Sequence, residues 1–138
     1  MMTAEQYEQF RESWRPTPEK VDLAVRKAVE IARPSRVFIF GSWARGEVRD
    51  SSDVDLAVLL PDERKAELAE IRARISQELR NIPMTIDLIV ASEGYAAEFL
   101  SSVNSVYYKI LRRGKLVYEN GNRQADESSA YQNSSPMT

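Results

Sequence analysis

Three aspartates and a Gly-Ser turn are the residues of this sequence whose types and spacing could do chemistry. Asp53 and Asp55 stand one residue apart at the start of an apolar run, and Asp87 interrupts a second run from Met84 to Val90. Gly41-Ser42 follows a third apolar run. Carboxylate oxygens suit hard divalent cations, and glycine lets the backbone approach a phosphate closely. Together these residues could hold a nucleotide and its metals.

The Asp53 and Asp55 side chains are expected on one face of a strand, because successive strand residues point to opposite faces. Two ionised carboxylates this close repel each other, and a divalent cation between them removes that cost. Asp87 would be costly to bury unpaired. If its strand lies next to that of Asp53 and Asp55, the three acids converge and could hold two metals about 3.5 to 4 Å apart. The alternative for the Asp53-Asp55 pair alone is a solvated turn before a strand.

The Gly41-Ser42 turn is a candidate phosphate cradle. Ser42 offers an amide and a hydroxyl, and the helical turn that should follow presents an N-terminus suited to anions. Arg45, one turn further on, could reach the same phosphate. Gly-Ser turns after strands are also ordinary, and Arg45 and Arg49 could simply be solvated.

The composition narrows the chemistry that these residues could support. The chain of 138 residues contains no cysteine and no histidine. Ser-His-Asp and Cys-His nucleophile systems, disulfides and typical zinc sites are therefore excluded, and a bound metal should be magnesium or manganese. A net charge of −2 argues against direct nucleic-acid binding.

The elements that must position these residues follow from the hydrophobic pattern. A small α/β or α+β domain on a mixed sheet is expected, with strands at 37–40, 53–60 and 84–90, an edge strand at 115–119, and helices at 5–14, 18–33 and 62–80. Another helix should start after its cap Ser92 and run to Arg113, with a break near Asn104. Within 5–14, Tyr7, Phe10 and Trp14 share one face. This aromatic face could be a docking element, but packing on the domain's own core is favoured.

The chain is expected to divide into three parts. Residues 1–16 form an N-terminal amphipathic helix, 17–119 the catalytic domain, and 120–138 a disordered tail that is rich in polar residues. The N-terminus has no signal-peptide pattern and no stretch is long enough to span a bilayer, so a cytoplasmic protein with no membrane association is expected.

Two motifs make the sequence resemble a known family. They are Phe40-Gly41-Ser42-Trp43-Ala44-Arg45-Gly46 and Ser52-Asp53-Val54-Asp55-Leu56. This arrangement is similar to the signature of the polymerase-β-like nucleotidyltransferases, and specifically of the minimal nucleotidyltransferases. The resemblance covers roughly Val21 to Glu119, and Asp87 falls where the family has its third acid.

The resemblance implies a nucleotidyltransferase fold and transfer of AMP from ATP to an acceptor hydroxyl, with release of pyrophosphate. Asp53, Asp55 and Asp87 would be the catalytic and metal-binding residues, holding two Mg²⁺ or Mn²⁺ ions, and Asp87 would help to deprotonate the acceptor. Gly41 and Ser42 would hold the β and γ phosphates, and the nucleotide-binding set is completed by Arg45 and Ser52.

Small proteins that resemble this one are typically antitoxins of a HEPN ribonuclease toxin, which they silence by adding AMP to a tyrosine. The resemblance therefore implies a HEPN toxin as partner and acceptor. Two alternatives stay open. The protein could neutralise its partner by binding alone, or it could transfer a nucleotide to an antibiotic or to a tRNA end.

Overall fold

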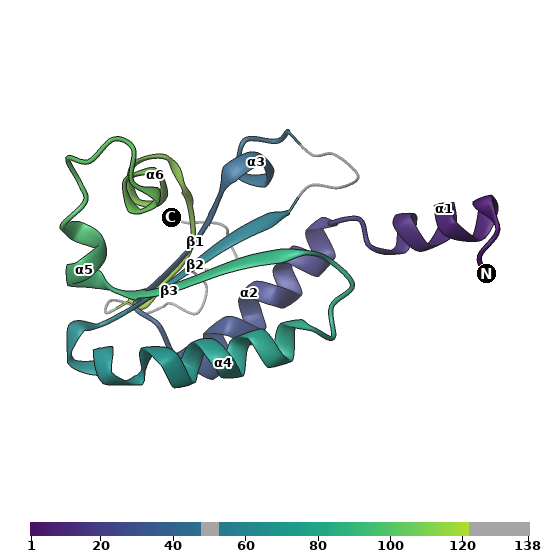
Figure 1. The fold of residues 1–138 in the computed structure, drawn as a ribbon. Coiled ribbons are helices and arrows are strands. Elements are labelled where there is room, and N and C mark those ends of the chain that lie inside the picture. The colour runs from purple at the N-terminus through teal and green to yellow at the C-terminus, as the bar shows by residue number, and fades with distance from the viewer. Residues whose placement is uncertain (48–52, 122–138) are drawn as a thin grey trace.

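A four-stranded mixed sheet forms the centre of the protein, with strand order β3-β2-β1-β4 (Figure 1). The computed structural model describes residues 1–47 and 53–121. β1 runs antiparallel to both β2 and β4, whereas β2 and β3 run parallel. The strands are β1 Arg36–Phe40, β2 Val54–Leu60, β3 Ile86–Ser92 and β4 Lys115–Glu119. The predicted small mixed sheet with flanking helices is confirmed.

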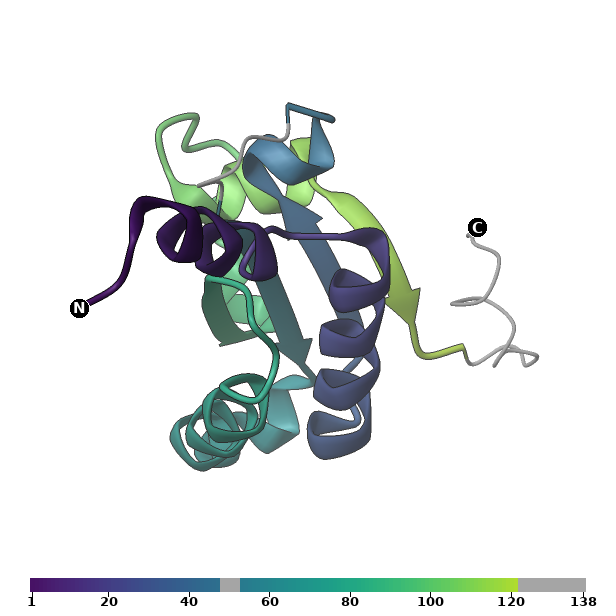
Figure 2. The ribbon, with the colours of Figure 1, turned by 90° about the vertical axis from the view of Figure 1, so that its right-hand side faces the viewer.

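Helices cover both faces of this sheet. They are α1 Ala4–Ser13, α2 Pro18–Ala32, α3 Gly41–Ala44, the 3₁₀ helix η1 Asp62–Glu67, α4 Leu68–Leu79, α5 Glu93–Ala97 and α6 Val106–Arg113. Figures 1 and 2 place α2 and α4 side by side on one face and α6 on the other. None of the helices in the described part of the chain combines the length and apolar character that crossing a membrane requires.

The alternation along β2 divides the core into two hydrophobic clusters. Val54, Leu56, Val58 and Leu60 are buried with residues of α2 and α4. Ala57 and Leu59 are buried on the other face with residues of α5 and α6. The predicted assignment of faces is therefore confirmed, and it places Asp55 on the same face as Ala57 and Leu59.

Helix α2 begins and ends where its capping residues predict. The Thr17 hydroxyl accepts the Lys20 N–H at 3.1 Å, and Pro18 takes the first helical position. Arg33 closes the helix with a left-handed backbone, φ 47°, directly before Pro34. Since the buried residues of α2 are spaced three and four apart, the helix lays one continuous stripe on the sheet.

Two predicted elements differ from the structure. The predicted helix over 62–80 starts as η1 and becomes α-helical only at Leu68, because tertiary bonds hold its first turns: Asp62 accepts the Gly94 N–H at 2.7 Å and Arg64 donates to the Arg33 carbonyl at 2.8 Å. The third strand was predicted at 84–90 but spans Ile86–Ser92, since it pairs with β2 along its whole length as far as Leu60 opposite Ser92. Periodicity alone does not set these bounds.

The segment after Ser92 forms two short helices with the expected break between them. Ser92 caps α5 by accepting the Tyr95 N–H at 3.3 Å, and Ser105 caps α6 by accepting the Tyr107 N–H at 3.1 Å. The rings of Tyr95, Phe99 and Tyr107 then contact one another with centroids 5.2 to 5.4 Å apart, Phe99 stacked on Tyr107 and Tyr95 edge-on to both. This aromatic cluster holds α5 and α6 together.

The aromatic face of the N-terminal helix does not pack on the core, so the favoured prediction was wrong. Helix α1 is formed locally, with a capping box between Thr3 and Gln6, and it buries none of its residues. It projects from the body of the molecule (Figure 1). Tyr7, Phe10 and Trp14 keep 56%, 49% and 40% of their surface exposed. The physical reason is that α2 and α4 already cover one face of the sheet, and α5 and α6 cover the other.

Arg36 on β1 and Glu93 at the start of α5 form a half-buried ion pair. The guanidinium donates to both carboxylate oxygens, at 2.7 and 3.0 Å, and the Ser35 hydroxyl donates to Oε2 at 2.7 Å. Burial alone would raise the pKa of Glu93, but the hydrogen bonds from Arg36 and Ser35 outweigh it and lower that pKa below its usual range. The pair ties α5 to the sheet.

We expect Glu93→Gln to lower the free energy of unfolding by about 1 kcal/mol at neutral pH. Because the folded pKa is lowered, the contribution of the carboxylate is present above its ordinary pKa of about 4.3 and is lost as the pH falls below that value. Urea titrations across this pH range test the expectation, with the exposed Glu63→Gln as control. If the difference in the free energy of unfolding between parent and variant stayed constant into strong acid, the expectation would be contradicted.

Candidate active site

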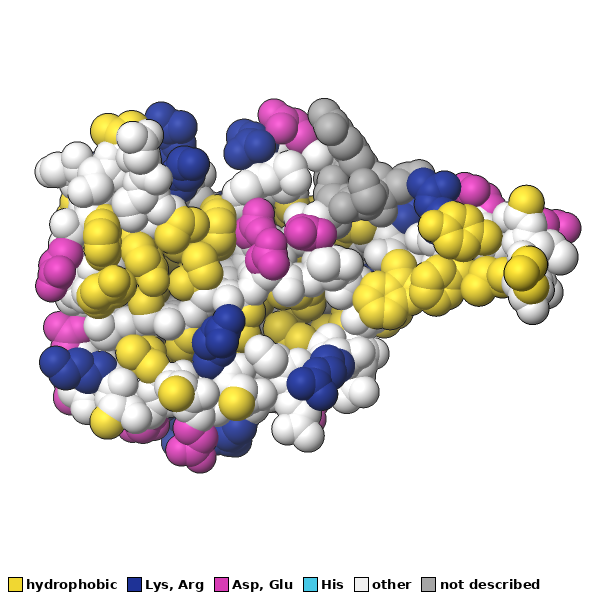
Figure 3. All heavy atoms as spheres, in the orientation of Figure 1, with side chains coloured by type: hydrophobic (Ala, Val, Ile, Leu, Met, Phe, Trp, Pro, Cys, Tyr) yellow, Lys and Arg dark blue, Asp and Glu magenta, His cyan; other side chains and the backbone are white. Residues whose placement is uncertain are grey.

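The pairing of β2 with β3 brings the predicted acids together. Asp55 stands directly opposite Asp87 in the parallel register. Asp53 lies one residue before β2 and is exposed, and the charge of Asp87 is near enough to raise its pKa. The expectation that the strand of Asp87 neighbours that of Asp53 and Asp55 is confirmed. Figure 3 shows acidic side chains gathered over this part of the sheet, beside a hydrophobic patch.

The surroundings of Asp53 and Asp55 disfavour the charged forms of these two carboxylates. Burial, together with the nearby negative charges of Asp87 and Asp53, raises the pKa of Asp55 to about 6, although Arg45 acts in the opposite direction. The pKa of Asp53 is also raised, by burial and then by Asp87. A cation placed among these oxygens would reverse both shifts, because the charged forms would then be favoured.

The donor set fits a hard divalent cation in its chemistry, since it consists of carboxylate oxygens. In the conformation of residues 1–47 and 53–121, however, no group of three or more His, Cys, Asp or Glu side chains is arranged so that it could hold a metal ion. The negative charge of Asp87 instead raises the pKa values of its two acidic neighbours. Metal binding would therefore require side-chain rotation, which the exposed Asp53 and Asp87 are free to make.

Gly41 lies against the Asp55 carboxylate. Its φ is +77°, and a Cβ atom added there would overlap Asp55 Oδ2. The neighbouring residues hold this turn in place, because Trp43 and Ala44 of α3 pack on the core and the Ser42 carbonyl accepts the Glu47 N–H at 2.9 Å. Only glycine combines this backbone conformation with so close an approach. The Gly-Ser turn and the acids therefore form one site.

Of the other predicted site residues, the structure describes one. Arg45 is exposed, pairs with Glu47 at 3.2 Å, and is near enough to lower the pKa of Asp55. Its charge therefore acts on the site without a direct ion pair to the acids. Ser52, together with Arg49, lies outside the described residues.

A cavity of about 440 Å³ opens beside the acids. Asp55 and Asp87 line it with Phe40, and Arg72 and Ser76 of α4 complete the wall on the other side of β3. The sequence alone did not single out Arg72 and Ser76, because α4 carries charged residues around most of its exposed surface. Because they are four residues apart on a helix, the sequence shows that they share a face. It does not show which part of the protein that face contacts.

Comparison with known proteins identifies the family. The profile of the family "Polymerase beta, Nucleotidyltransferase" matches residues 24–123, well over half of the chain. The chain belongs to this nucleotidyltransferase family. The resemblance predicted from the two motifs is confirmed at this level, and the matched range contains Gly41 as well as all three acids.

Solved structures resemble the chain in fold. A proposed nucleotidyltransferase from Sulfolobus solfataricus has a TM-score of 0.50 and 20% identity, over 74% of this chain and 79% of that one. A crystal structure of a toxin-antitoxin with AMP-PNP has a TM-score of 0.44 and 21% identity, over 72% and 73%. No curated protein is significantly similar in sequence. At 20% identity, the first likeness shows the nucleotidyltransferase fold and nothing finer.

Proposed function

We propose that this family member transfers AMP from ATP to a hydroxyl group of a partner protein. The observation that carries the proposal is the juxtaposition of Asp55 with Asp87 across β2 and β3, with Gly41 against the Asp55 carboxylate. A nucleotidyltransferase needs carboxylates and a close-approach turn at one place, and here both occur at the same strand ends.

In the proposed reaction the acceptor oxygen attacks the α-phosphorus of ATP. A new oxygen–phosphorus bond forms, the bond to the bridging oxygen breaks, and pyrophosphate leaves with the displaced electron pair. Asp87, the most solvent-accessible acid of the pair that faces the cavity, accepts the proton of the acceptor hydroxyl. Gly41 and Ser42 hold the β and γ phosphates, with Arg45 and Ser52 beside them.

Asp53, Asp55 and Asp87 would hold two magnesium ions in this proposal. Bound there, the ions would neutralise phosphate charge and favour an ionised acceptor oxygen. Asp55 stands opposite Asp87 across β2 and β3, and the lack of a side chain at Gly41 leaves room for the Asp55 carboxylate. These residues therefore orient the reacting groups whether the ion is Mg²⁺ or Mn²⁺.

The proposed acceptor is a tyrosine of a HEPN ribonuclease toxin, for which the protein acts as a cytoplasmic antitoxin. Two features support a protein acceptor. The cavity beside Asp55 and Asp87 opens at the molecular surface, and the aromatic face of α1 is exposed rather than packed. A bound partner protein could cover both the cavity and the aromatic face.

The decisive experiment measures the intact mass of a HEPN ribonuclease encoded beside this gene and co-expressed with the protein, ATP and magnesium. We expect the ribonuclease to gain mass in units of one AMP. Co-expression with the Asp53→Ala, Asp55→Ala double variant is the control, and its partner should keep its original mass. A toxin that is neutralised with no mass gain in either case would contradict the transfer reaction.

That last outcome would favour a second candidate function, neutralisation by binding alone. The exposed aromatic face of α1 is the observation behind it, since three large aromatics on a projecting helix would contribute to an interface whatever the acids do. Loss of neutralisation on Tyr7→Ser, Phe10→Ser substitution, with the acids intact, would identify α1 as the docking element.

A further inference from the structure

The outer edge of β3 carries unpaired backbone groups. β3 is an edge strand of the sheet, and the Val54 N–H of β2 bonds to the Thr85 carbonyl at 3.0 Å. In a parallel pair each residue turns both its N–H and its C=O to the same side, and successive residues alternate. It follows that Ile86, Leu88 and Val90 direct their backbone groups away from β2, where no described residue bonds to them.

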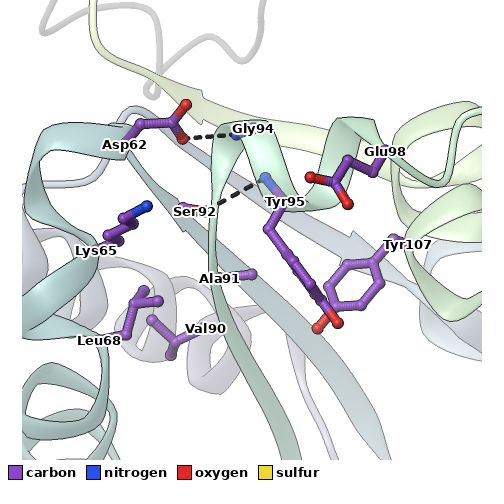
Figure 4. A pocket seen from close by; sticks show the side chains of 10 residues that line it. All are labelled: Asp62, Lys65, Leu68, Val90, Ala91, Ser92, Gly94, Tyr95, Glu98 and Tyr107. Carbon is purple, nitrogen blue, oxygen red and sulfur yellow. Dashed lines mark hydrogen bonds between the residues drawn. The ribbon is translucent and has the colours of Figure 1, made fainter.

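Two cavities lie in series along this open edge, and together we call them the edge groove. The first, of about 440 Å³, includes Ile86 to Ile89 together with Asp55. The second, of about 520 Å³, includes Val90 to Ser92. Figure 4 shows the second with Lys65 and Leu68 on one side of β3 and Tyr95 and Tyr107 on the other. The edge groove therefore leads along β3 to the acids.

The two walls of the edge groove differ in chemistry. On the α4 side Lys65 and Arg72 are exposed, and neither forms an ion pair with any residue that the structure describes. On the α5 and α6 side Tyr95, Tyr107 and Val106 form an aromatic and apolar wall. Acidic side chains also line the groove: Glu98 beside the tyrosines, Asp55 and Asp87 at the far end, and Asp62, which accepts the Gly94 N–H. The α4 side would suit anionic side chains, and the opposite wall would suit apolar or cationic ones.

We propose that the edge groove binds an extended segment of a partner protein, which adds to the sheet as a fifth strand beside β3. Its alternate side chains would be acidic toward Lys65 and Arg72, and apolar toward Tyr95 and Tyr107. Backbone pairing at three residues selects a polypeptide over a nucleic acid, because only a polypeptide supplies the matching N–H and C=O groups. The mode is β-strand addition to an exposed sheet edge.

A second copy of this chain fits the edge groove less well. Antiparallel pairing of β3 with its copy about a two-fold axis would place both α4 helices on the same face of the joined sheet. Lys65 and Arg72 of the two copies would then face like charges across the junction, which is unfavourable. An acidic segment instead compensates these two cations.

The role of such a segment rests on the proposed function, while its binding does not. If the protein transfers AMP, a strand added at β3 would carry its side chains past Asp87 and so deliver a hydroxyl to the site. Binding itself requires neither ATP nor metal. The two proposals can therefore fail separately.

The test selects nine-residue random peptides displayed on phage against the full chain, without nucleotide. We expect the recovered peptides to alternate acidic with β-branched or aromatic residues. The best peptide, labelled with fluorescein, should bind at least tenfold more weakly to the double variant Lys65→Glu, Arg72→Glu. It should bind equally well to Arg74→Glu, which reverses one charge on the α2 side of α4.

Backbone pairing is tested separately by Leu88→Pro, which removes the outward N–H at a position where an edge strand tolerates proline. Leu88→Ala, which keeps the N–H, is its matched control. Should Leu88→Pro fail to fold, the pairing is tested with the same peptide N-methylated at alternate amides, which removes N–H groups of the peptide instead. We expect its affinity for the protein to fall at least tenfold.

Several results would overturn the proposal. The first is that selection on the parent enriches no more peptides than selection on the Lys65→Glu, Arg72→Glu variant. The second is that the N-methylated peptide binds as well as the unmodified one. The third is that the protein forms a dimer, which Leu88→Pro dissociates. If the peptide binds as expected but the co-expressed ribonuclease gains no AMP, the edge groove stands and the proposed function fails. If AMP is transferred and no peptide is selected, the proposed function stands and the edge groove proposal fails.

Discussion

Asp55→Asn should reduce AMP transfer by about a thousandfold, corresponding to about 4 kcal/mol of lost transition-state stabilisation. Asp55 is the acid that stands opposite Asp87, touches the space beside Gly41 and lines the cavity. The amide keeps the shape of the side chain but supplies one acceptor oxygen and no charge. The measurement is the initial rate of mass gain of the partner with saturating ATP and magnesium.

The same substitution should stabilise the metal-free protein. Because the pKa of Asp55 is raised to about 6, folding disfavours its ionised form. The contribution of Asp55 to the free energy of unfolding is therefore lost as the pH rises from about 4 through about 6. Asparagine removes that cost. Allowing for solvent screening, we expect a gain of roughly 1 kcal/mol in the free energy of unfolding at pH 8.

Thermal unfolding separates these effects. Magnesium should raise the melting temperature of the parent more than that of Asp55→Asn, because the variant keeps only two of the three proposed carboxylate ligands. The exposed Asp22→Asn on α2 is the control, and it should follow the parent in both activity and magnesium response. An Asp55→Asn protein that is less stable than the parent without metal would mean that the carboxylate has a structural partner instead.

The second large effect is expected at Gly41. Gly41→Ala should lower the free energy of unfolding by about 2 kcal/mol and reduce AMP transfer by at least about a hundredfold. Two causes act together: a left-handed backbone, φ +77°, that alanine adopts poorly, and a Cβ that would overlap the Asp55 carboxylate. The displaced carboxylate accounts for the loss of activity.

Gly46→Ala is a matched control for this change. Gly46 has almost the same backbone, φ +76°, but a Cβ added there meets nothing within 4 Å. It should therefore lose about 1 kcal/mol of stability from the backbone alone and keep its transfer rate within about twofold. Urea titration and the mass assay on both variants test the comparison. Equal losses of activity would show that the contact with Asp55 is unimportant.

The elements with the strongest local signals were predictable from sequence. Thr17, Pro18 and Pro34 mark the ends of α2, and the alternation from Val54 to Leu60 sorts β2 into two buried faces. Capping and side-chain alternation depend on residues close in the chain, so a single sequence carries them. The absence of cysteine and histidine likewise limited the chemistry to carboxylates, hydroxyls and cations.

The bounds of η1 and β3 were less predictable, because they depend on distant partners. The first turns after Pro61 are shaped by bonds from Asp62 to Gly94 and from Arg64 to Arg33, and β3 ends where its pairing with β2 ends. The amphipathic pattern of α1 indicated that its aromatic face is suited to burial. It could not indicate that the rest of the chain leaves that face uncovered.

By itself, the sequence determined which residues could act: an acid pair on one strand face, a third acid within another strand, and a glycine turn. Only the tertiary structure decided that β3 lies beside β2, that Asp87 faces Asp55, and that Gly41 touches that carboxylate. It also decided that the outer edge of β3 is open. The physical reason is that side-chain alternation is local, whereas strand order and register depend on how all elements share the burial of one core.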